Sequence, residues 1–187
     1  MEFSTIVIVI IVGLLLLLAF YVIGVYNKLV NARNKVNNQW SQIDVQLKRR
    51  ADLIPNLVET VKGYAKHEEG TFKAVVEARN KSVSAVNVND KIEAENQLTG
   101  ALNKLFALSE AYPELKANEN FMSLQEDLSE TEDKITYARQ FYNDSAMSFN
   151  DLVEMFPSNV VAKMFGFKAF EFFSATEEEK KAPKVKF

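Results

Sequence analysis

The residues that could carry chemistry are few in this chain. Its single histidine, His67, lies in YAKHEEG outside any H-E-x-x-H pattern, and no glutamate stands three residues before it, as a carboxylate-bridged metal pair in a helical bundle requires. There is no cysteine, glycine-rich phosphate loop or G-x-S-x-G motif. We therefore expect no catalytic residue, metal ligand, cofactor or small-molecule substrate. His67 is interpreted as a solvated or capping residue near a helix C-terminus.

The acidic stretch QEDLSETEDK, residues 125–134, is the other candidate for chemistry, because clustered carboxylates can bind divalent cations. Leu128 and Thr131 within it fall on the apolar stripe of a helix, and the acidic residues flank that stripe. This arrangement favours the solvated face of a helix over a cation site.

Composition excludes further classes of function. The formal charge is −3 and the isoelectric point is about 5.4. General affinity for nucleic acid needs a strongly basic surface that displaces counterions from phosphate. Nucleic acid is therefore not an expected partner.

The strongest signal is an uncharged N-terminal stretch. Residues 6–25, IVIVIIVGLLLLLAFYVIGV, are about twenty apolar residues, which is enough to cross a hydrocarbon core as a helix. A cleaved signal peptide would have a basic start, a shorter apolar core and small residues before the cleavage site. The chain begins with Glu2 and has no such site, which favours a retained anchor.

Charges after the span predict its orientation. Six basic residues and one acidic residue lie within 28–50, whereas Glu2 is the charged side chain before the span. Lys and Arg near the ends of a span favour the cytoplasmic side. We expect a single-pass membrane protein with a short N-terminus outside and a cytoplasmic C-terminal domain.

A helical stripe follows the span. Apolar residues recur at alternating spacings of four and three, which predicts one helix from Tyr26 to about Lys66, with nothing separating it from the span. Arg33 and Arg50 occupy two positions of the stripe, and Pro55 should kink the helix near Ala51 without ending it. The apolar positions are Val36, Trp40, Ile43, Leu47, Ile54, Leu57, Val61 and Tyr64.

Arg50 fills the gap in this stripe between Leu47 and Ile54, so we expect its charged side chain to be buried. A buried unpaired charge would be costly, so it needs a carboxylate partner. Asp90 or Glu93 should supply it, with Asp144 as the alternative.

A second helical region begins near Thr71. It falters at residues 87–90, where Asp90 and Glu93 have the spacing of a capping box and predict a new N-terminus. Two helices, or one helix with a break, both remain open. The stripe of the first part is Phe72, Val75, Arg79, Ser82, Val83 and Val86, and that of the second is Leu98, Leu102, Leu105, Phe106 and Tyr112.

A last long helix is predicted from about Asn118 to Pro157. Two sets of residues alternate along its packed side. Ser158 should cap a short amphipathic helix continuing to Phe173. Along the helix from Asn118 to Pro157, the first set is Phe121, Leu128, Ile135, Tyr142 and Phe149, and the second set is Leu124, Thr131, Ala138, Ser145 and Leu152.

The predicted fold class is therefore all-α, with an N-terminal transmembrane helix, a long antiparallel helical bundle resembling a four-helix bundle, and a short C-terminal amphipathic helix. Four segments follow: the N-terminus and span (1–26), the bundle (27–155), a Phe-rich segment (156–174) and a mobile charged tail (175–187).

The Phe-rich segment must cover something. Six of the fourteen phenylalanines lie between Phe156 and Phe173. Three helical regions of alternating direction would place this segment at the end of the bundle away from the membrane, near His67. Closure of the bundle end is the first expectation, and self-association or a partner site is the next.

Three stretches together resemble the LemA family of bacterial membrane proteins, and the resemblance extends from Tyr26 to Phe173. They are YNKLVNARNKVNNQWSQIDVQLKRRADLIPNLVETVKGYAKHE, AYPELKANENFMSLQEDLSETEDKI and YARQFYNDSAMSFNDLVEMFPSNVVAKMFGF. The resemblance implies a transmembrane helix, a soluble domain of long antiparallel helices and a bacterial cytoplasmic membrane location. It implies no settled activity, although relatives are associated with membrane organisation and with cell-surface or antigenic roles.

Two functions follow as hypotheses. The first is a membrane-anchored, non-enzymatic scaffold that acts through protein contacts, either as a homo-oligomer or with another membrane-associated protein. The alternative is a membrane-shaping or lipid-organising protein that acts through Lys28, Arg33 and Lys35 on anionic headgroups.

Overall fold

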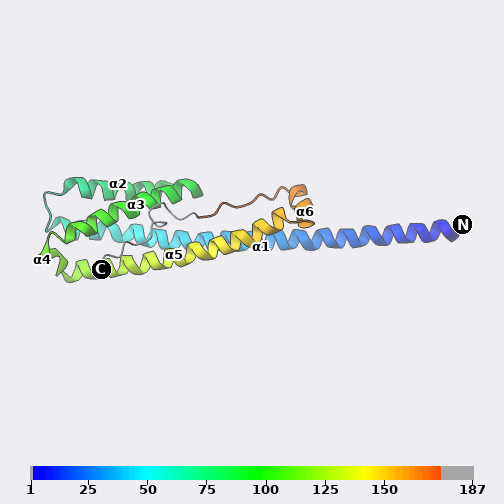
Figure 1. The fold of residues 1–187 in the computed structure, drawn as a ribbon, viewed down its shortest axis with the longest axis horizontal. Helices are drawn as coiled ribbons and strands as arrows, with labels where there is room; N and C mark the ends of the chain where they lie inside the picture. The colour runs from blue at the N-terminus through cyan, green and yellow to red at the C-terminus, as the bar shows by residue number, and fades with distance from the viewer. Residues whose placement is uncertain (1, 174–187) are drawn as a thin grey trace, which may run out of the picture. The chain divides into compact units, whose positions relative to one another are not determined.

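The computed structural model describes residues 2–173, and in this range the chain forms helices and no strand (Figure 1). The expected all-α fold is confirmed. The expected tail, 175–187, lies outside the described residues. The helices are α1 (Glu2–Lys62), α2 (Glu69–Ser84), α3 (Val88–Ser109), α4 (Pro113–Lys116), α5 (Glu119–Glu154) and α6 (Ser158–Met164).

The described chain divides into two compact units, and α1 and α5 each contribute to both. The first unit contains residues 2–41 and 140–172, and the second contains residues 42–139 and 173. Each unit has buried apolar side chains of its own.

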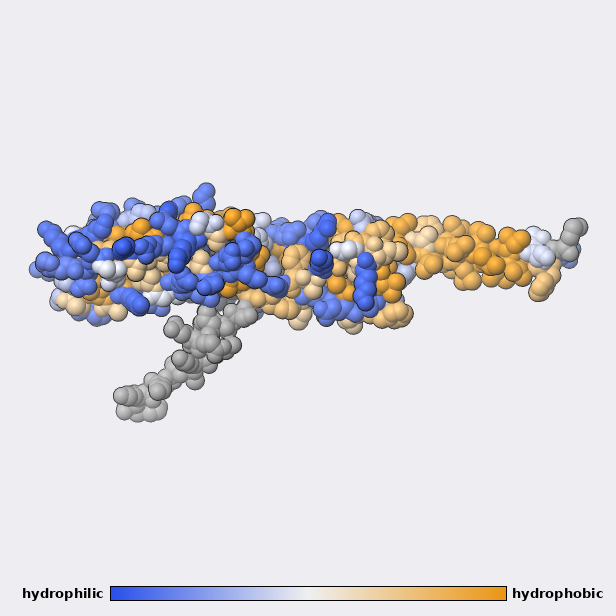
Figure 2. Space-filling view, turned by 90° about the horizontal axis from the view of Figure 1, so that it is seen from above, coloured by the Kyte–Doolittle hydropathy of each residue, from blue (hydrophilic) through white to orange (hydrophobic). Residues whose placement is uncertain are grey.

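α1 is one continuous helix of 61 residues that includes both the apolar stretch and the stripe that follows it. Its N-terminal part is long and apolar enough to cross a membrane. Figure 2 shows this part as a continuous hydrophobic surface. Pro55 lies inside the helix without ending it, as predicted. The helix ends at Lys62, four residues before the predicted end, because the chain turns at Gly63 and Tyr64.

The second unit is built around the buried stripe of α1. Ile54, Leu57 and Val61 pack with Phe72 and Val75 of α2. Burying a side chain of this size stabilises the fold by about 1.5–3 kcal/mol. The other core residues are Val58, Ala65, Ala78, Leu98, Ala101, Leu102, Leu105, Leu115, Phe121 and Leu128.

The sequence left open whether the second helical region is one helix with a break or two helices. The structure shows two separate helices, α2 and α3. The predicted N-cap at Asp90 is wrong. Asn87 is the N-cap, and its Oδ1 accepts a hydrogen bond from the Asp90 backbone N–H at 2.8 Å. Asp90 lies in the first turn, where a carboxylate is favoured by the helix dipole.

α5 follows the predicted pattern closely. Asn118 Oδ1 accepts a hydrogen bond from the Phe121 backbone N–H at 3.0 Å, which caps the helix where the sequence predicts its start. All five members of the first predicted set are buried, together with Thr131 and Ser145 of the second.

Three predictions for the C-terminal part are wrong. α6 ends at Met164 and residues 165–173 are not helical, so the amphipathic helix is shorter than expected. Ser158 does not cap it, because its hydroxyl donates to the Met155 carbonyl at 2.9 Å. The Phe-rich segment also lies beside Tyr26 in the first unit, where the Tyr26 and Phe165 ring centroids are 4.8 Å apart. The α2–α3 hairpin adds one more reversal of direction, so within the second unit α5 runs antiparallel to α1, with Asn118 beside Tyr64 and Glu132 beside Arg50.

Candidate functional site

Arg50 is buried at the centre of the second unit, with 1% of its surface exposed. Its Nη2 lies 2.5 Å from Glu95 Oε2 and 3.2 Å from the Glu95 carbonyl oxygen. Its Nη1 donates to Thr99 Oγ1 at 3.1 Å and to Glu132. The guanidinium of α1 therefore joins α3 to α5, and four acceptors satisfy its two terminal nitrogens.

Glu95 is as buried as Arg50, and its second carboxylate oxygen accepts from Ser82 of α2. Four helices thus meet in one polar network. A buried ion pair adds little net stability, because the cost of removing both charges from water offsets their attraction. Each charged member has an ionic partner within the network, whereas the Arg50 Nε has no hydrogen-bond partner among the described residues.

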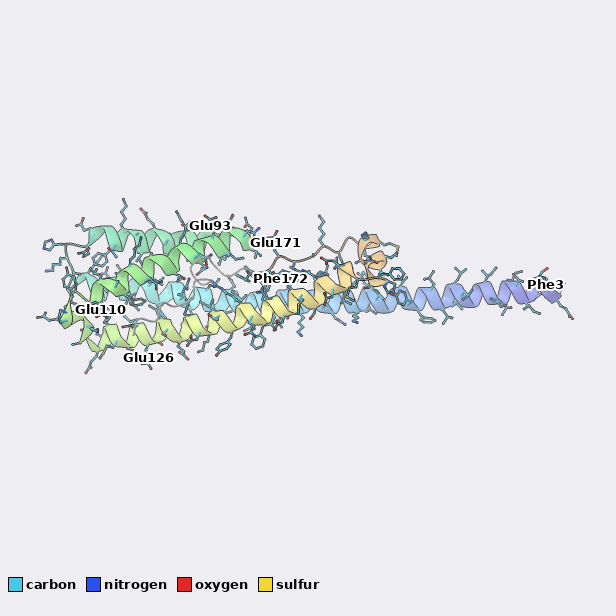
Figure 3. All side chains as sticks on the ribbon, viewed as in Figure 1. Phe3, Glu93, Glu110, Glu126, Glu171 and Phe172 are labelled. Carbon is cyan, nitrogen blue, oxygen red and sulfur yellow. The ribbon has the colours of Figure 1, made fainter. Side chains whose placement is uncertain are left out.

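The predicted burial of Arg50 is confirmed, but its predicted partners are wrong. Asp90 bonds to the Asn87 side chain, and Asp144 is exposed. Glu93 points outward from α3 and contacts Gln97 (Figure 3). The N-terminus of α3 lies earlier than the sequence indicated. Glu95 stands three residues before the buried Leu98 and seven before the buried Leu102, which places it on the inner side of α3.

The two neighbours of Arg50 in the basic triplet point in different directions, because successive helical residues are rotated by about 100°. Arg49 lies 3.4 Å from Asp127 and 3.5 Å from Glu130 at the exposed surface. Lys48 lines a cavity of about 200 Å³ with Asp44, Asp52, Arg79 and Lys91 among its walls. The triplet is therefore three separate side chains with three different environments.

The cavity beside Lys48 has charged walls that already pair with protein groups. Lys91 Nζ lies 3.1 Å from Asp44 Oδ1. Arg79 Nε donates to the Ala51 carbonyl oxygen at 3.2 Å. Since basic and acidic groups are mixed in these walls, the cavity shows no preference for an anion or a cation.

The acidic stretch on α5 behaves mainly as a solvated face. Glu130 is exposed, and the hydrogen bond from Lys134 holds its pKa below the ordinary value, with smaller help from Arg49. Glu132 is the exception, since it reaches Arg50. Within residues 2–173, no group of three acidic, histidine or cysteine side chains has the geometry of a metal site. His67 is exposed in the turn after α1.

The Phe-rich segment covers its own helices in the first unit. Phe149 of α5 packs edge-on against Phe167 and Phe170, with ring centroids 6.2 Å and 5.2 Å away. The Asn150 side chain makes two hydrogen bonds to the backbone of Phe170. Its Oδ1 accepts from the Phe170 N–H at 2.8 Å, and its Nδ2 donates to the Phe170 carbonyl at 2.9 Å. The extended chain carrying Glu171 and Phe172 is labelled in Figure 3.

The juxtamembrane basic residues also lie in the first unit. The Arg33 guanidinium stands 5.4 Å from the Phe167 ring centroid, at cation–π distance, and is exposed, contrary to its predicted seam position. Lys28 and Lys35 border a groove of about 690 Å³ whose other walls include Asp151, Met155 and Phe156. These lysines are exposed, as a contact with headgroups requires.

Sequence reasoning missed three residues that organise these sites. Glu95 and Glu132 were hidden among many exposed acidic residues. Asn150 follows Phe149 in a helix of ordinary composition, and no pattern marks it. Arg79 was detectable, because it stands in an apolar stripe as Arg50 does.

Together these features define residues 2–173 as an all-helical protein with one candidate membrane span in α1 and a buried ionic cluster. The LemA family model matches residues 39–187. The chain belongs to the LemA family.

Three named relatives that are similar to this chain follow. Protein LemA of Metamycoplasma hominis is 30% identical over 165 residues, which cover 86% of this chain and 74% of the relative. Magnetosome protein MamQ of Magnetospirillum gryphiswaldense is 25% identical over 174 residues, which cover 79% of this chain and 64% of MamQ. Magnetosome protein MamQ 2 of Paramagnetospirillum magneticum matches with the same identity and coverage. The match spans less than two thirds of the MamQ proteins, and none of these names denotes an enzyme.

Proposed function

We propose that this chain is a membrane-anchored, non-catalytic scaffold that acts through protein contacts and associates with copies of itself. The observation that carries the proposal is the continuity of α1. One helix contains the apolar span and also the buried residues Ile43, Ile54 and Val61. A packed domain that begins in the same helix as its anchor is joined to the membrane without a flexible linker, which suits a protein that holds partners there.

The use of the charged groups supports a scaffold over an enzyme. Catalytic acids and bases must reach a substrate in a cleft. Arg50 and Glu95 are both 1% exposed and bonded to each other. Their geometry serves the alignment of helices.

Exposed apolar side chains of the second unit support self-association. Val83 of α2 is 54% exposed, Val86 after α2 is 96% exposed, and Tyr137 of α5 is 63% exposed. Interfaces are rich in such residues, and tyrosine is favoured among the residues that contribute most to binding. A second copy would remove these side chains from water.

Co-purification of two differently tagged copies tests the proposal. Both are expressed together at native level, and one tag is used to capture the other from cross-linked membranes. The replacement of Val83, Val86 and Tyr137 by Glu should abolish capture, whereas Lys73→Glu with Lys104→Glu, at two exposed sites, should not. If the full-length chain yields monomers alone and captures no partner, the proposal fails.

The orientation belongs to the same proposal, with the N-terminus outside the cytoplasmic membrane of a bacterium and the helical domain in the cytoplasm. The distribution of Lys and Arg after the span supports it. Single cysteines at Phe3 and Val86 are both exposed. An impermeant maleimide added to intact spheroplasts should label the first and spare the second, and the reverse pattern would refute this orientation.

A second candidate function is membrane shaping through Lys28, Arg33 and Lys35. The exposure of all three side chains favours it. Each basic residue near an anionic surface contributes about 1 kcal/mol to binding. Reconstituted protein should then deform anionic vesicles more than neutral ones, and equal behaviour on both would remove this candidate.

A further inference from the structure

An apolar surface surrounds α6 in the first unit. Met155, Phe156, Val160, Met164 and Phe165 are all at least half exposed, and Phe156 reaches 81%. We call these five residues the α6 apolar face. Val161 and Ala162 of the same helix are buried against the unit. α6 is therefore apolar on its packed side and also on its outer side, which a water-exposed helix does not need.

The α6 apolar face is joined directly to the end of the membrane span. Phe165 contacts Tyr26, and Phe167 is 5.9 Å from the same ring. Tyr26 is the residue that follows the apolar stretch 6–25, and tyrosine at that position is typical of the membrane–water interface. If Tyr26 lies at the membrane–water interface, Phe165 lies at the same interface, because the two rings are in contact.

Partial burial at the end of the span agrees with this placement. Val22 and Val25 are half-buried, whereas the rest of the stretch from Ile6 to Gly24 is exposed. The last turn of the span thus already has protein beside it. The exposed hydrophobic surface of α1 continues onto an exposed hydrophobic surface of the same unit (Figure 2).

Basic side chains stand next to the α6 apolar face. Lys28 and Lys35 lie across a groove from Met155 and Phe156. Lys163 is exposed in the last turn of α6. Apolar side chains bordered by lysines are the pattern by which interfacial helices bind anionic lipid, with the rings among acyl chains and the ammonium groups at phosphates. Asp151 is the one acidic residue that lines the groove.

We infer that the α6 apolar face is a second membrane contact, which inserts into the interfacial layer of the bilayer that α1 crosses, with Lys28 and Lys35 binding anionic phospholipid headgroups. The contact lies beyond the scaffold function and does not depend on self-association. A bilayer fits better than a second copy, because the face is continuous with the span and its rim is cationic. It would fix α6 and the end of α5 at the membrane surface.

Spin-label accessibility in reconstituted vesicles tests the inference. The chain has no cysteine, so each single-cysteine variant carries one label. Phe156→Cys, Val160→Cys and Met164→Cys report on the face. Phe141→Cys and Met147→Cys are matched controls on α5 in the same unit, with exposures of 58% and 53%. All five are surface positions, so the labels leave the packed core intact.

The full-length protein is placed in vesicles of phosphatidylcholine and phosphatidylglycerol. Relative accessibility to oxygen over a water-soluble nickel complex should be several-fold higher at the three face positions than at the two controls. Replacing Lys28 and Lys35 by Gln should lower the ratio at position 156. A ratio at the face equal to that at the controls overturns the inference, and an unchanged ratio in the lysine variant overturns the role of the lysines.

A second copy as occupant gives a different result. The labels at 156 and 164 would then be shielded from both reagents and would show dipolar broadening that disappears when unlabelled protein is added in excess. That outcome overturns the inference while it leaves self-association standing. The two proposals are therefore separable in one set of samples.

Discussion

Arg79 Nε donates a hydrogen bond to the carbonyl oxygen of Ala51 at 3.2 Å. In a regular helix that carbonyl would bond to the N–H four residues later, and the residue there is Pro55, which has none. α2 thus satisfies the acceptor that the proline leaves open in α1. The proline creates a binding position for one specific side chain, which helps to fix the alignment of the two helices.

A double-mutant cycle tests this pairing. Arg79→Ala should lower the free energy of unfolding by about 1–2 kcal/mol, because the Ala51 carbonyl loses its donor. In a Pro55→Ala background the helix supplies its own N–H, so the same change should cost at least about 0.5 kcal/mol less. Chemical denaturation of the four proteins in detergent measures the coupling. An equal cost in both backgrounds would show that Arg79 acts by packing alone.

Arg50→Leu should be far more damaging than Lys48→Ala. The first change leaves Glu95 buried without its cation, at a cost of about 3–5 kcal/mol. The second removes a side chain that is exposed, with an expected effect within about 0.5 kcal/mol. Thermal melts of the two variants provide the comparison, and equal shifts in Tm would refute the account. Glu95→Leu added to Arg50→Leu should recover part of the loss, since no buried charge then remains unpaired.

Tyr142 makes the stability of the first unit depend on alkaline pH. Burial raises its pKa above the ordinary value, and the nearby Glu171 carboxylate adds to the shift. Its hydroxyl donates to the Glu171 carbonyl at 3.1 Å. The neutral phenol therefore contributes stability that is complete below about pH 10 and is lost as pH rises further.

Tyr142→Phe removes both the hydrogen bond and the titration. At pH 8 the variant should be about 1 kcal/mol less stable than the wild type. The difference should shrink as the pH rises above about 10, because only the wild type then loses this contribution. Unfolding curves at matched pH values check the result, and a difference that stays constant with pH would contradict it.

Asn150 should control the order of the Phe-rich segment. Asn150→Ala removes both hydrogen bonds to the Phe170 backbone, so amide exchange in residues 167–172 should accelerate. Ser148→Ala is the matched control, since that exposed hydroxyl bonds only within α5. Hydrogen–deuterium exchange of the full chain reports both. Unchanged protection in the Asn150 variant would mean that the phenylalanine contacts suffice.

The long helices of this fold were predictable from sequence, because a helix that buries one side carries apolar residues on that side every three or four positions. The α5 positions Phe121, Leu128, Ile135, Tyr142 and Phe149 are all buried as predicted. The continuity of α1 through Pro55 was also predictable, since its stripe keeps register across the proline.

What the sequence did not reveal depended on counting elements and on choosing one carboxylate among many. Glu95 lies on the same side of α3 as the predicted stripe residues Leu98 and Leu102, and it pairs with Arg50 in place of the predicted Asp90 or Glu93. The prediction treated α2 and α3 as one helical region running in one direction. It therefore gave α5 the wrong direction and placed Phe165 at the wrong end of the bundle. Asn150 was not found because a side chain that bonds to a backbone distant in sequence leaves no periodic signal.

The central claim is that the anchored chain works as an assembly in its membrane, and a count of copies tests it most directly. A fluorescent tag on the full-length chain, expressed at native level, allows photobleaching steps to be counted for single spots in bacterial membranes. The account predicts two or more steps in most spots, and a return to single steps when Val83, Val86 and Tyr137 are replaced by Glu. Single-step bleaching of the unmodified chain throughout would contradict it.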